Sequence, residues 1–386
     1  MVAGEPRVSV STEVIEWAIL RAGKDRDTLS GRFTWLNQTA LDNVFSVTMP
    51  QLMLFAKTTY TPYGYFFLDE PPEEPLPLPD FRTVRSELMQ RPSANLLDTI
   101  YQAQMRQAWY HDYRRRWGED PVPVVGSGAG KTVAAVAGMM TLALGVGLGA
   151  RRSFRTPGDL LREVLDSIEG LGVLVQVSGV VGNDTHRRLA VEEFRGFALS
   201  DDLAPVIFVN GQDSLAAKVF TVLHELAHLY AGQSALSDAP LGREPGAGEL
   251  WCNQVAAEVL VPADDLRTRF RGDLAVASID ALARFYGVST LVVLNQLFNT
   301  QLLSWDVFRP RYVDEVGRAN GHLSASLRKP GGDFYKTQGR RFGKDFRRAV
   351  VADTVAGNTQ FTEAARLLGT SNLDTVMSTA GQSGDL

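Results

Sequence analysis

The spacing of apolar residues predicts helices and short strands in different parts of the chain. Val14–Gly23 and Thr48–Lys57 have helical periodicity, and the first of these segments ends at a glycine. Gly158–Gly170 has the pattern of an amphipathic helix. It is followed by three short apolar runs typical of strands, at Gly172–Val177, Phe194–Leu199 and Pro205–Asn210. We therefore expect an α+β fold in which a small sheet packs against helices.

One apolar helical segment, Phe220–Tyr230, carries the pattern H-E-x-x-H. His224 and His228 are four residues apart, so on a helix both imidazoles lie on one face and can reach one metal ion. Glu225 sits beside that edge, where a carboxylate can take a proton from water at the metal. Only 5 histidines occur in the chain, and two of them fall here, which favours a metal site over a core helix with incidental polar residues.

A third ligand is expected from a second helical segment, Gly248–Pro262. Glu249 and Glu258 are both candidates. Glu249 shares one helix face with Asn253 and the small Ala256, which favours it by spacing. Glu258 lies on another side among larger apolar residues, where a structural carboxylate is equally acceptable, so the spacing leaves both open.

These two segments, H-E-L-A-H and then E-L-W-C-N-Q-V-A-A-E-V-L-V-P, resemble the ImmA/IrrE family of zinc metallopeptidases (the DUF955 domain) over about residues 165–300. The resemblance implies Zn²⁺ held by His224, His228 and Glu249, with Glu225 as the catalytic base. Asn253 matches a residue that follows the ligand, and we expect it to contact the ligand residues rather than the metal. Glu258 matches a frequent acidic residue that is not a ligand. The implied core is of gluzincin type, with a small sheet packed on the metal helix.

The same resemblance implies endopeptidase activity on a regulatory protein, often a helix-turn-helix repressor, in a stress or mobile-element response. An extended substrate peptide is expected to add to a sheet edge, for which Phe194–Leu199 is the candidate strand. A protease component of a toxin–antitoxin system, with an antitoxin as substrate, would have the same active site. A DNA-binding regulator with structural or vestigial zinc is the remaining alternative.

Four regions are predicted along the chain: 1–83, 84–150, 151–300 and 301–386. The first resembles a degenerate XRE-type helix-turn-helix domain followed by a proline-rich linker, and it serves either DNA binding or protein docking. The second is a helical connector, the third is the metallopeptidase core, and the fourth is helical.

Several observations limit the alternatives. The formal net charge is −5, which argues against wholesale binding to nucleic acid. The single cysteine excludes an internal disulfide, and the first twenty residues lack the apolar core of a signal peptide, so a cytoplasmic location is expected.

Val133–Ala150 is apolar, but its glycines favour a buried helix over a membrane span, and no membrane partner is predicted. Gly126–Thr132 resembles a phosphate loop, but Val125 stands where its first glycine is needed.

The C-terminal region contains the densest basic stretch. Arg328–Arg348 has eight Lys or Arg against two Asp, interleaved with aromatic residues, which is equally typical of a solvated face and of a surface for nucleic acid or an acidic partner. The candidate binding residues are Arg328, Lys329, Lys336, Arg340, Arg341, Lys344, Arg347 and Arg348. Upstream, Leu282–Leu294 resembles a helix-turn-helix with Gly-Val-Ser at its turn, and packing explains it as well as DNA binding does.

Overall fold

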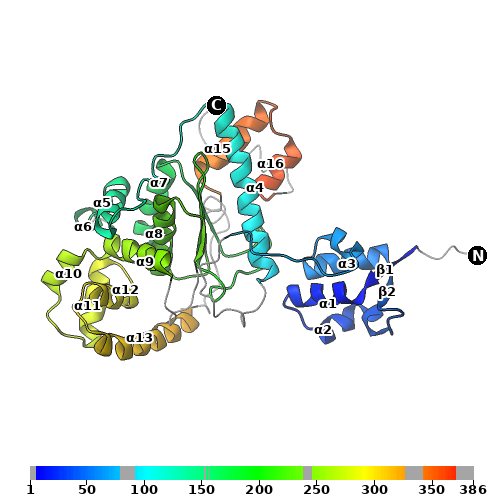
Figure 1. The fold of residues 1–386 in the computed structure, drawn as a ribbon, viewed down its shortest axis with the longest axis horizontal. Coiled ribbons are helices and arrows are strands. Elements are labelled where there is room, and N and C mark those ends of the chain that lie inside the picture. The colour runs from blue at the N-terminus through cyan, green and yellow to red at the C-terminus, as the bar shows by residue number, and fades with distance from the viewer. Residues whose placement is uncertain are drawn as a thin grey trace, which may run out of the picture. The chain divides into compact units, whose positions relative to one another are not determined.

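The computed structural model describes residues 6–78, 92–151, 154, 156–237, 246–326 and 342–370. They form mixed α and β structure that is mostly helical with small sheets, which confirms the α+β class (Figure 1). The chain divides into two compact units. The first comprises Met1–Pro77 with Ser86–Ile100, and the second comprises Leu78–Arg85 with Tyr101–Leu386.

The first unit combines helices with a two-stranded antiparallel ribbon. Strand β1 (Arg7–Ser11) pairs with β2 (Val44–Thr48), and the sequence analysis did not predict either strand. Both predicted helices are present, and the second begins with a capping box in which Thr48 and Gln51 satisfy each other's backbone N–H groups. The helices are α1 (Thr12–Arg21), α2 (Arg26–Arg32) and α3 (Met49–Thr59), with 3-10 turns η1 (Thr34–Asn37) and η2 (Tyr63–Phe67).

The core of this unit is aromatic. The Phe55 ring centroid lies 5.1 Å from that of Trp35 and 5.7 Å from that of Phe66, both in edge-to-face geometry. Such pairs contribute beyond the area they bury. The unit therefore has a hydrophobic core of its own.

A four-stranded sheet organises the second unit. Its strands are β3 (Leu174–Ser178), β4 (Gly196–Leu199), β5 (Val206–Asn210) and β6 (Ala235–Ser237), in the order β3-β5-β4-β6. The three predicted strands are present; β3 and β5 are parallel and the other pairs are antiparallel. The expectation that Phe194–Leu199 forms a sheet edge is wrong. The chain returns after the helix at Leu215–Ala231 and adds β6 outside β4, so β4 is interior.

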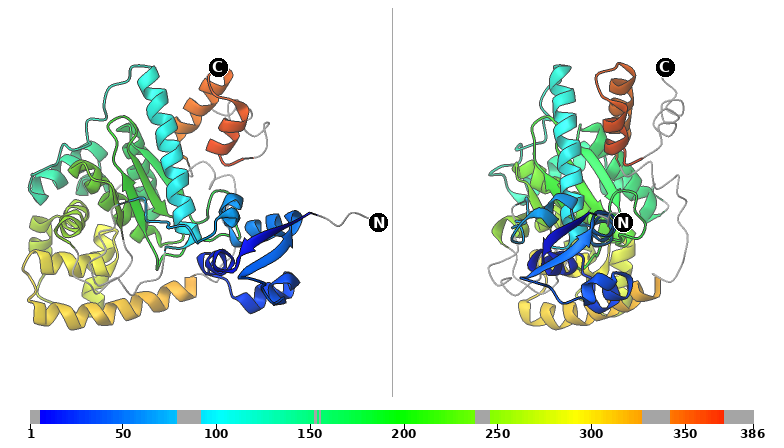
Figure 2. Two further views of the ribbon diagram at one scale, coloured as in Figure 1. Left: turned by 45° about the vertical axis from the view of Figure 1, so that its right-hand side comes forward. Right: turned by 90° about the vertical axis from the view of Figure 1, so that its right-hand side faces the viewer.

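Helices cover both faces of this sheet (Figure 2). The predicted amphipathic helix is α7 (Pro157–Gly170), and it packs with α8 (Leu215–Ala231) against one face through Val175, Ile207 and Val209. On the other face, Gln176 accepts a hydrogen bond from Arg106 of α4 (Ala94–Arg116) at 3.2 Å. The sheet is thereby held between two helical layers.

The remaining helices surround this core. They are α5 (Val133–Leu144), α6 (Leu148–Arg151), α9 (Ala247–Leu260), α10 (Ala263–Arg269), α11 (Val276–Tyr286), α12 (Thr290–Asn299), α13 (Trp305–Ser326), α15 (Lys344–Val355) and α16 (Phe361–Leu367). In the described part of the chain, no single helix has the length and apolar composition of a membrane span. Helices α11 and α12 reach that length and apolar composition only when they are taken together, and the chain bends by 95° between them. This pair includes the segment that resembles a helix-turn-helix, and Val293, Leu294 and Leu297 are buried in the core.

The glycine-rich loop that resembles a phosphate loop covers the end of α8. The Gly126 N–H donates to the Leu229 carbonyl at 2.9 Å, and the Gly128 N–H donates to the Tyr230 carbonyl at 2.7 Å. These carbonyls belong to the last turn of the helix, where regular i+4 partners are missing, although Leu229 also accepts a hydrogen bond from the Gly232 N–H at 2.9 Å. The loop therefore satisfies the carboxyl end of α8 with the N–H groups that a phosphate would require.

The helices α15 and α16 pack beside α4 in both views of Figure 2. The Phe346 ring centroid lies 5.6 Å from that of Trp109 and 5.8 Å from that of Tyr110. The aromatic residues at the end of α4 therefore serve packing, and the basic Arg116 of that segment pairs with Asp353 at 2.9 Å.

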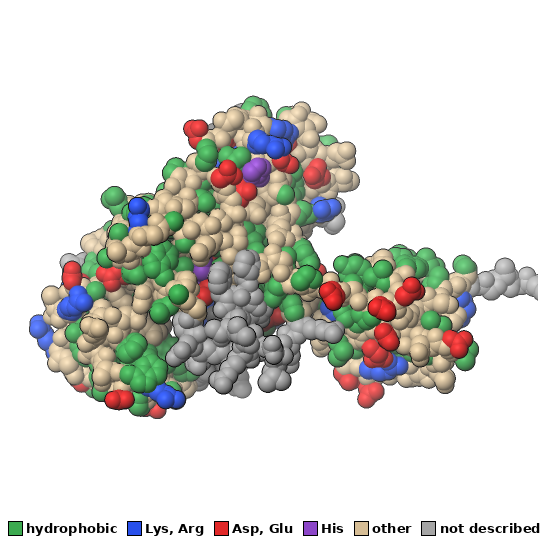
Figure 3. Space-filling model, in the orientation of Figure 1, with side chains coloured by type: hydrophobic (Ala, Val, Ile, Leu, Met, Phe, Trp, Pro, Cys, Tyr) green, Lys and Arg blue, Asp and Glu red, His purple; other side chains and the backbone are tan. Residues whose placement is uncertain are grey.

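Most of the predicted basic patch, residues 327–341, lies outside the described residues. Of its described members, Lys344 pairs with Asp166 at 2.8 Å and Arg348 with Asp345 at 3.4 Å, and Arg347 is half-buried. On the face shown in Figure 3, the Lys and Arg side chains are scattered among acidic ones. Nucleic-acid binding by this stretch stays a prediction.

Candidate metal centre

Two packed helices, α8 and α9, supply the predicted site residues. Helix α8 begins where Ser214 accepts a hydrogen bond from the Ala217 N–H at 3.2 Å, and it ends at Gly232, whose φ of 73° suits glycine. Helix α9 places Glu249 in its first turn, where the helix dipole favours a carboxylate. The i and i+4 spacing on α8 and this early position on α9 bring the three side chains to one point.

The predicted ligand atoms converge closely. His228 Nε2 lies 2.9 Å from Glu249 Oε1, and His224 Nε2 lies 3.1 Å from Glu249 Oε2. The two Nε2 atoms are 3.1 Å apart. All three side chains are buried or nearly so, with exposed fractions of 4%, 0% and 9% for His224, His228 and Glu249. The geometry fits one ion between three donors.

The donor chemistry and spacing suit a divalent cation. In a tetrahedral zinc site with bonds of about 2.0–2.1 Å to nitrogen and oxygen, neighbouring ligand atoms are about 3.3 Å apart. The three separations here are within a few tenths of an ångström of that value. Two imidazoles and one carboxylate also leave a coordination position for a further group, as in catalytic sites.

Glu225 is the most deeply buried carboxylate at this point. Its exposed fraction is 0%, and neither carboxylate oxygen has a hydrogen-bond partner within the described residues. Burial raises the pKa of Glu225 to about 8. A buried carboxylate without a partner is costly, and a cation at the adjacent ligands would favour its ionised form.

The surroundings of Glu249 favour its ionised form instead. Burial by itself raises its pKa, but hydrogen bonds from His224 and His228 outweigh burial and lower the pKa of Glu249 to about 2. The two neighbouring carboxylates therefore differ strongly in proton affinity. The two histidines favour the ionised form of Glu249, whereas burial favours the protonated form of Glu225.

The other residues singled out from the sequence have separate positions. Burial lowers the pKa of His224, but the neighbouring carboxylates of Glu249 and Glu225 outweigh it and raise that pKa, with the amide oxygen of Asn253 acting in the same direction as an acceptor for the imidazole. Glu258 accepts hydrogen bonds from the Ala263 N–H at 3.1 Å and from Gln296 at 2.7 Å, so its contacts are structural. His186 is exposed in its loop.

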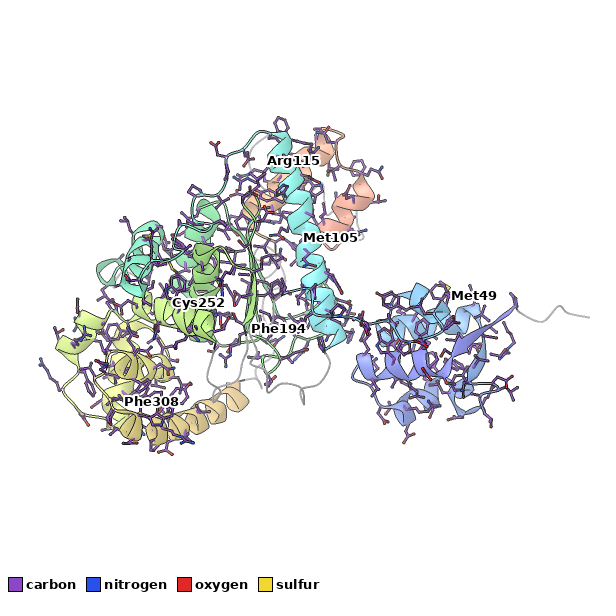
Figure 4. All side chains as sticks on the ribbon, viewed as in Figure 1. Met49, Met105, Arg115, Phe194, Cys252 and Phe308 are labelled. Atoms are coloured by element: carbon purple, nitrogen blue, oxygen red, sulfur yellow. The ribbon has the colours of Figure 1, made fainter. Side chains whose placement is uncertain are left out.

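Two further groups have metal-binding atoms but different surroundings. His111, Asp201 and Asp202 also cluster, yet His111 and Asp201 are only half-buried, and Asp201 accepts two backbone N–H groups. Cys252 lies on α9 (Figure 4), where burial strongly raises the pKa of its thiol and keeps it inert. Neither group shares the geometry of the α8–α9 cluster.

The site contains residues that the sequence analysis did not identify. Gly196 of β4 lies against Glu225: a Cβ at this glycine would be 2.9 Å from Glu225 Oε1. Its partner across the ladder is Ser237 of β6. No short motif contains these residues, because the strand pairing that joins them is long-range.

Two imidazoles and a carboxylate converge on one point, with a buried carboxylate beside them, and this group of side chains could hold a metal ion. Residues 168–298 match the family model of the IrrE N-terminal-like domain, Peptidase_M78. This match supports the ImmA/IrrE resemblance and a metallopeptidase-type function for that part of the chain. Residues 342–382 match a second model, a domain of unknown function named DUF8813. A search of curated proteins gave no match to this chain.

Proposed function

We propose that this protein is a zinc-dependent endopeptidase with a gluzincin-like core. The observation that supports the proposal most directly is the convergence of His224, His228 and Glu249 at 2.9–3.1 Å beside the buried Glu225. The peptidase family match over residues 168–298 agrees with it.

In the proposed mechanism, His224, His228 and Glu249 would hold the ion. Zinc bound there would supply Lewis acidity, which activates water and polarises the scissile carbonyl. Glu225 takes the proton from the attacking water and passes it to the leaving amine. Asn253 is proposed to hold the His224 ring.

The substrate is proposed to be a protein chain that binds in extended form along β6. This strand is at the edge of the described sheet, and it ends at Ser237, opposite the glycine that contacts Glu225. A peptide added there would gain backbone hydrogen bonds and pass close to the base. From the family resemblance, we propose a regulatory protein of the helix-turn-helix repressor type as the natural target. An antitoxin target would use the same site.

The test compares four variants of the full-length protein by elemental analysis and by cleavage of a co-expressed candidate repressor. His228→Ala and Glu249→Gln should lose most of the roughly one zinc per chain, because each removes a ligand. Glu225→Gln should keep zinc and lose about 10²–10⁴-fold in cleavage rate, because only the base is removed. Glu258→Gln is the matched control and should retain zinc and activity.

Full zinc in His228→Ala would contradict the ligand assignment. Loss of zinc in Glu258→Gln but not in Glu249→Gln would show that the third ligand is misassigned. Specific DNA binding by a protein that keeps zinc but cleaves nothing would favour the regulator with structural zinc.

A further inference from the structure

The strand pair that lies under Glu225 presents a glycine and a hydroxyl to it. Gly196 and Ser237 are directly opposite each other in the antiparallel pairing of β4 and β6. Directly opposite residues in such a pair point to the same face of the sheet. Gly196 faces α8, since a Cβ there would meet Thr221 at 2.7 Å and Glu225 at 2.9 Å. Ser237 therefore also faces α8 beside the Glu225 carboxylate.

The side chains of Ser237 and Glu225 are both buried. Ser237 is 6% exposed and Glu225 is 0% exposed. Within the described part of the chain, the Ser237 hydroxyl and both Glu225 oxygens have no aligned hydrogen-bond partner. Rotation of the serine side chain about its Cα–Cβ bond would align the hydroxyl with the carboxylate.

We propose that Ser237 is a positioning residue: its hydroxyl donates a hydrogen bond to the Glu225 carboxylate and orients it toward the group bound at the metal. This inference rests on the proposed function. A buried carboxylate on a helix is free to rotate about its terminal bond unless a donor fixes it. Gly196 allows the carboxylate to lie against the sheet, and Ser237 provides the donor at the edge of that flat surface. The donor comes from the same strand that we propose binds the substrate, so substrate binding and base orientation share one element.

The experiment uses the zinc-loaded full-length protein and acetohydroxamate as the probe, with binding measured by calorimetry. A hydroxamate chelates the ion and places its hydroxyl where a general base receives a proton, so its affinity reports the orientation of Glu225 without a natural substrate. Ser237→Thr keeps the hydroxyl and Ser237→Val has the same shape without it, which makes them a matched pair in a strand position. Ser237→Ala completes the series.

We expect Ser237→Val and Ser237→Ala to retain about one zinc per chain and to bind acetohydroxamate about 3- to 10-fold more weakly, as for loss of one hydrogen bond. Ser237→Thr should bind as the wild type does. In a Glu225→Gln background, the valine and alanine substitutions should have little further effect, because residue 225 can no longer take the hydroxamate proton and its orientation then no longer affects the affinity.

Equal hydroxamate affinity in the threonine and valine variants, with weakened binding in Glu225→Gln, would overturn the role of Ser237 and leave the proposed function standing. A loss that persists undiminished in the Glu225→Gln background would show a merely structural effect and also overturn it. A wild-type protein that binds neither zinc nor acetohydroxamate would overturn the proposed function, and this inference with it.

Discussion

Gly196 stands where three groups leave no room for a side chain. A Cβ there would be 2.7 Å from Thr221 Cγ2, 2.8 Å from the Phe208 carbonyl oxygen and 2.9 Å from Glu225 Oε1. The carbonyl belongs to the adjacent strand and cannot move without breaking the ladder. The glycine is thus required by the close approach of α8 to the sheet, which sets the position of Glu225.

Gly196→Ala should therefore both destabilise the protein and displace the base. We expect a loss of about 1–3 kcal/mol in the free energy of unfolding, as for overpacking of a core, measured by urea unfolding. Gly138→Ala is the control, because nothing lies within 4 Å of a Cβ at that exposed helical position. It should be neutral or stabilising by up to about 1 kcal/mol. Equal effects of the two substitutions would contradict the packing of α8 on β4.

At the scale of elements, α15 is joined to α4 through a buried carboxylate. Asp353 is 2% exposed and accepts hydrogen bonds from Thr359 at 2.6 Å, Arg116 at 2.9 Å and Asn358 at 3.2 Å. Burial acts against the charged form, but these bonds outweigh it and hold the pKa of Asp353 below its ordinary value of 3.8. The carboxylate therefore stabilises the folded protein only while it is ionised.

Because the folded pKa is lowered, this contribution is fully present above about pH 3.8 and is lost as the pH falls through the folded value. Asp353→Asn should lower the free energy of unfolding by about 1.5–3 kcal/mol at pH 7, the range for hydrogen bonds to a charged group. The difference from the wild type should shrink when unfolding is measured near pH 3. Asp345→Asn is the control, since Asp345 is exposed at the start of the same helix. A difference that is the same at both pH values would contradict the role of the charge.

At the scale of the whole molecule, the two units have separate hydrophobic cores. The site residues all belong to the second unit. The proposed endopeptidase needs a device that restricts its substrates, and we propose the first unit for this role. Its exposed apolar residues, Leu41 and Met53 among them, suit contact with another protein.

A protein that lacks residues 1–100, and so the whole first unit, should retain about one zinc per chain but lose cleavage of its natural target. The site and its core remain intact, whereas the proposed selecting unit is gone. Zinc is measured by elemental analysis and cleavage by co-expression with the candidate repressor. Undiminished cleavage would place substrate selection in the second unit, and specific DNA binding by residues 1–100 would favour the regulator instead.

The sequence by itself determined the local features of this protein. Helix α8 and the shared face of His224 and His228 follow from a spacing of four residues, which needs no tertiary contact. The strands β3 and β5 follow from short apolar runs between turn residues. The family resemblance chose Glu249, whose proximity to the two histidines the structure shows; spacing left Glu258 open, because both carboxylates lie on the same helix.

Only the tertiary structure decided what depends on long-range pairing. The sequence did not predict β1, β2 and β6, because their short segments become strands through partners elsewhere in the chain. The addition of β6 moved the sheet edge away from β4 and brought Ser237 to Glu225. Gly128 and its loop could not be assigned from a motif either, since the carbonyls that they satisfy come from a helix about a hundred residues later. Hydrogen bonds and close contacts of this kind are made in space, and a linear pattern does not contain them.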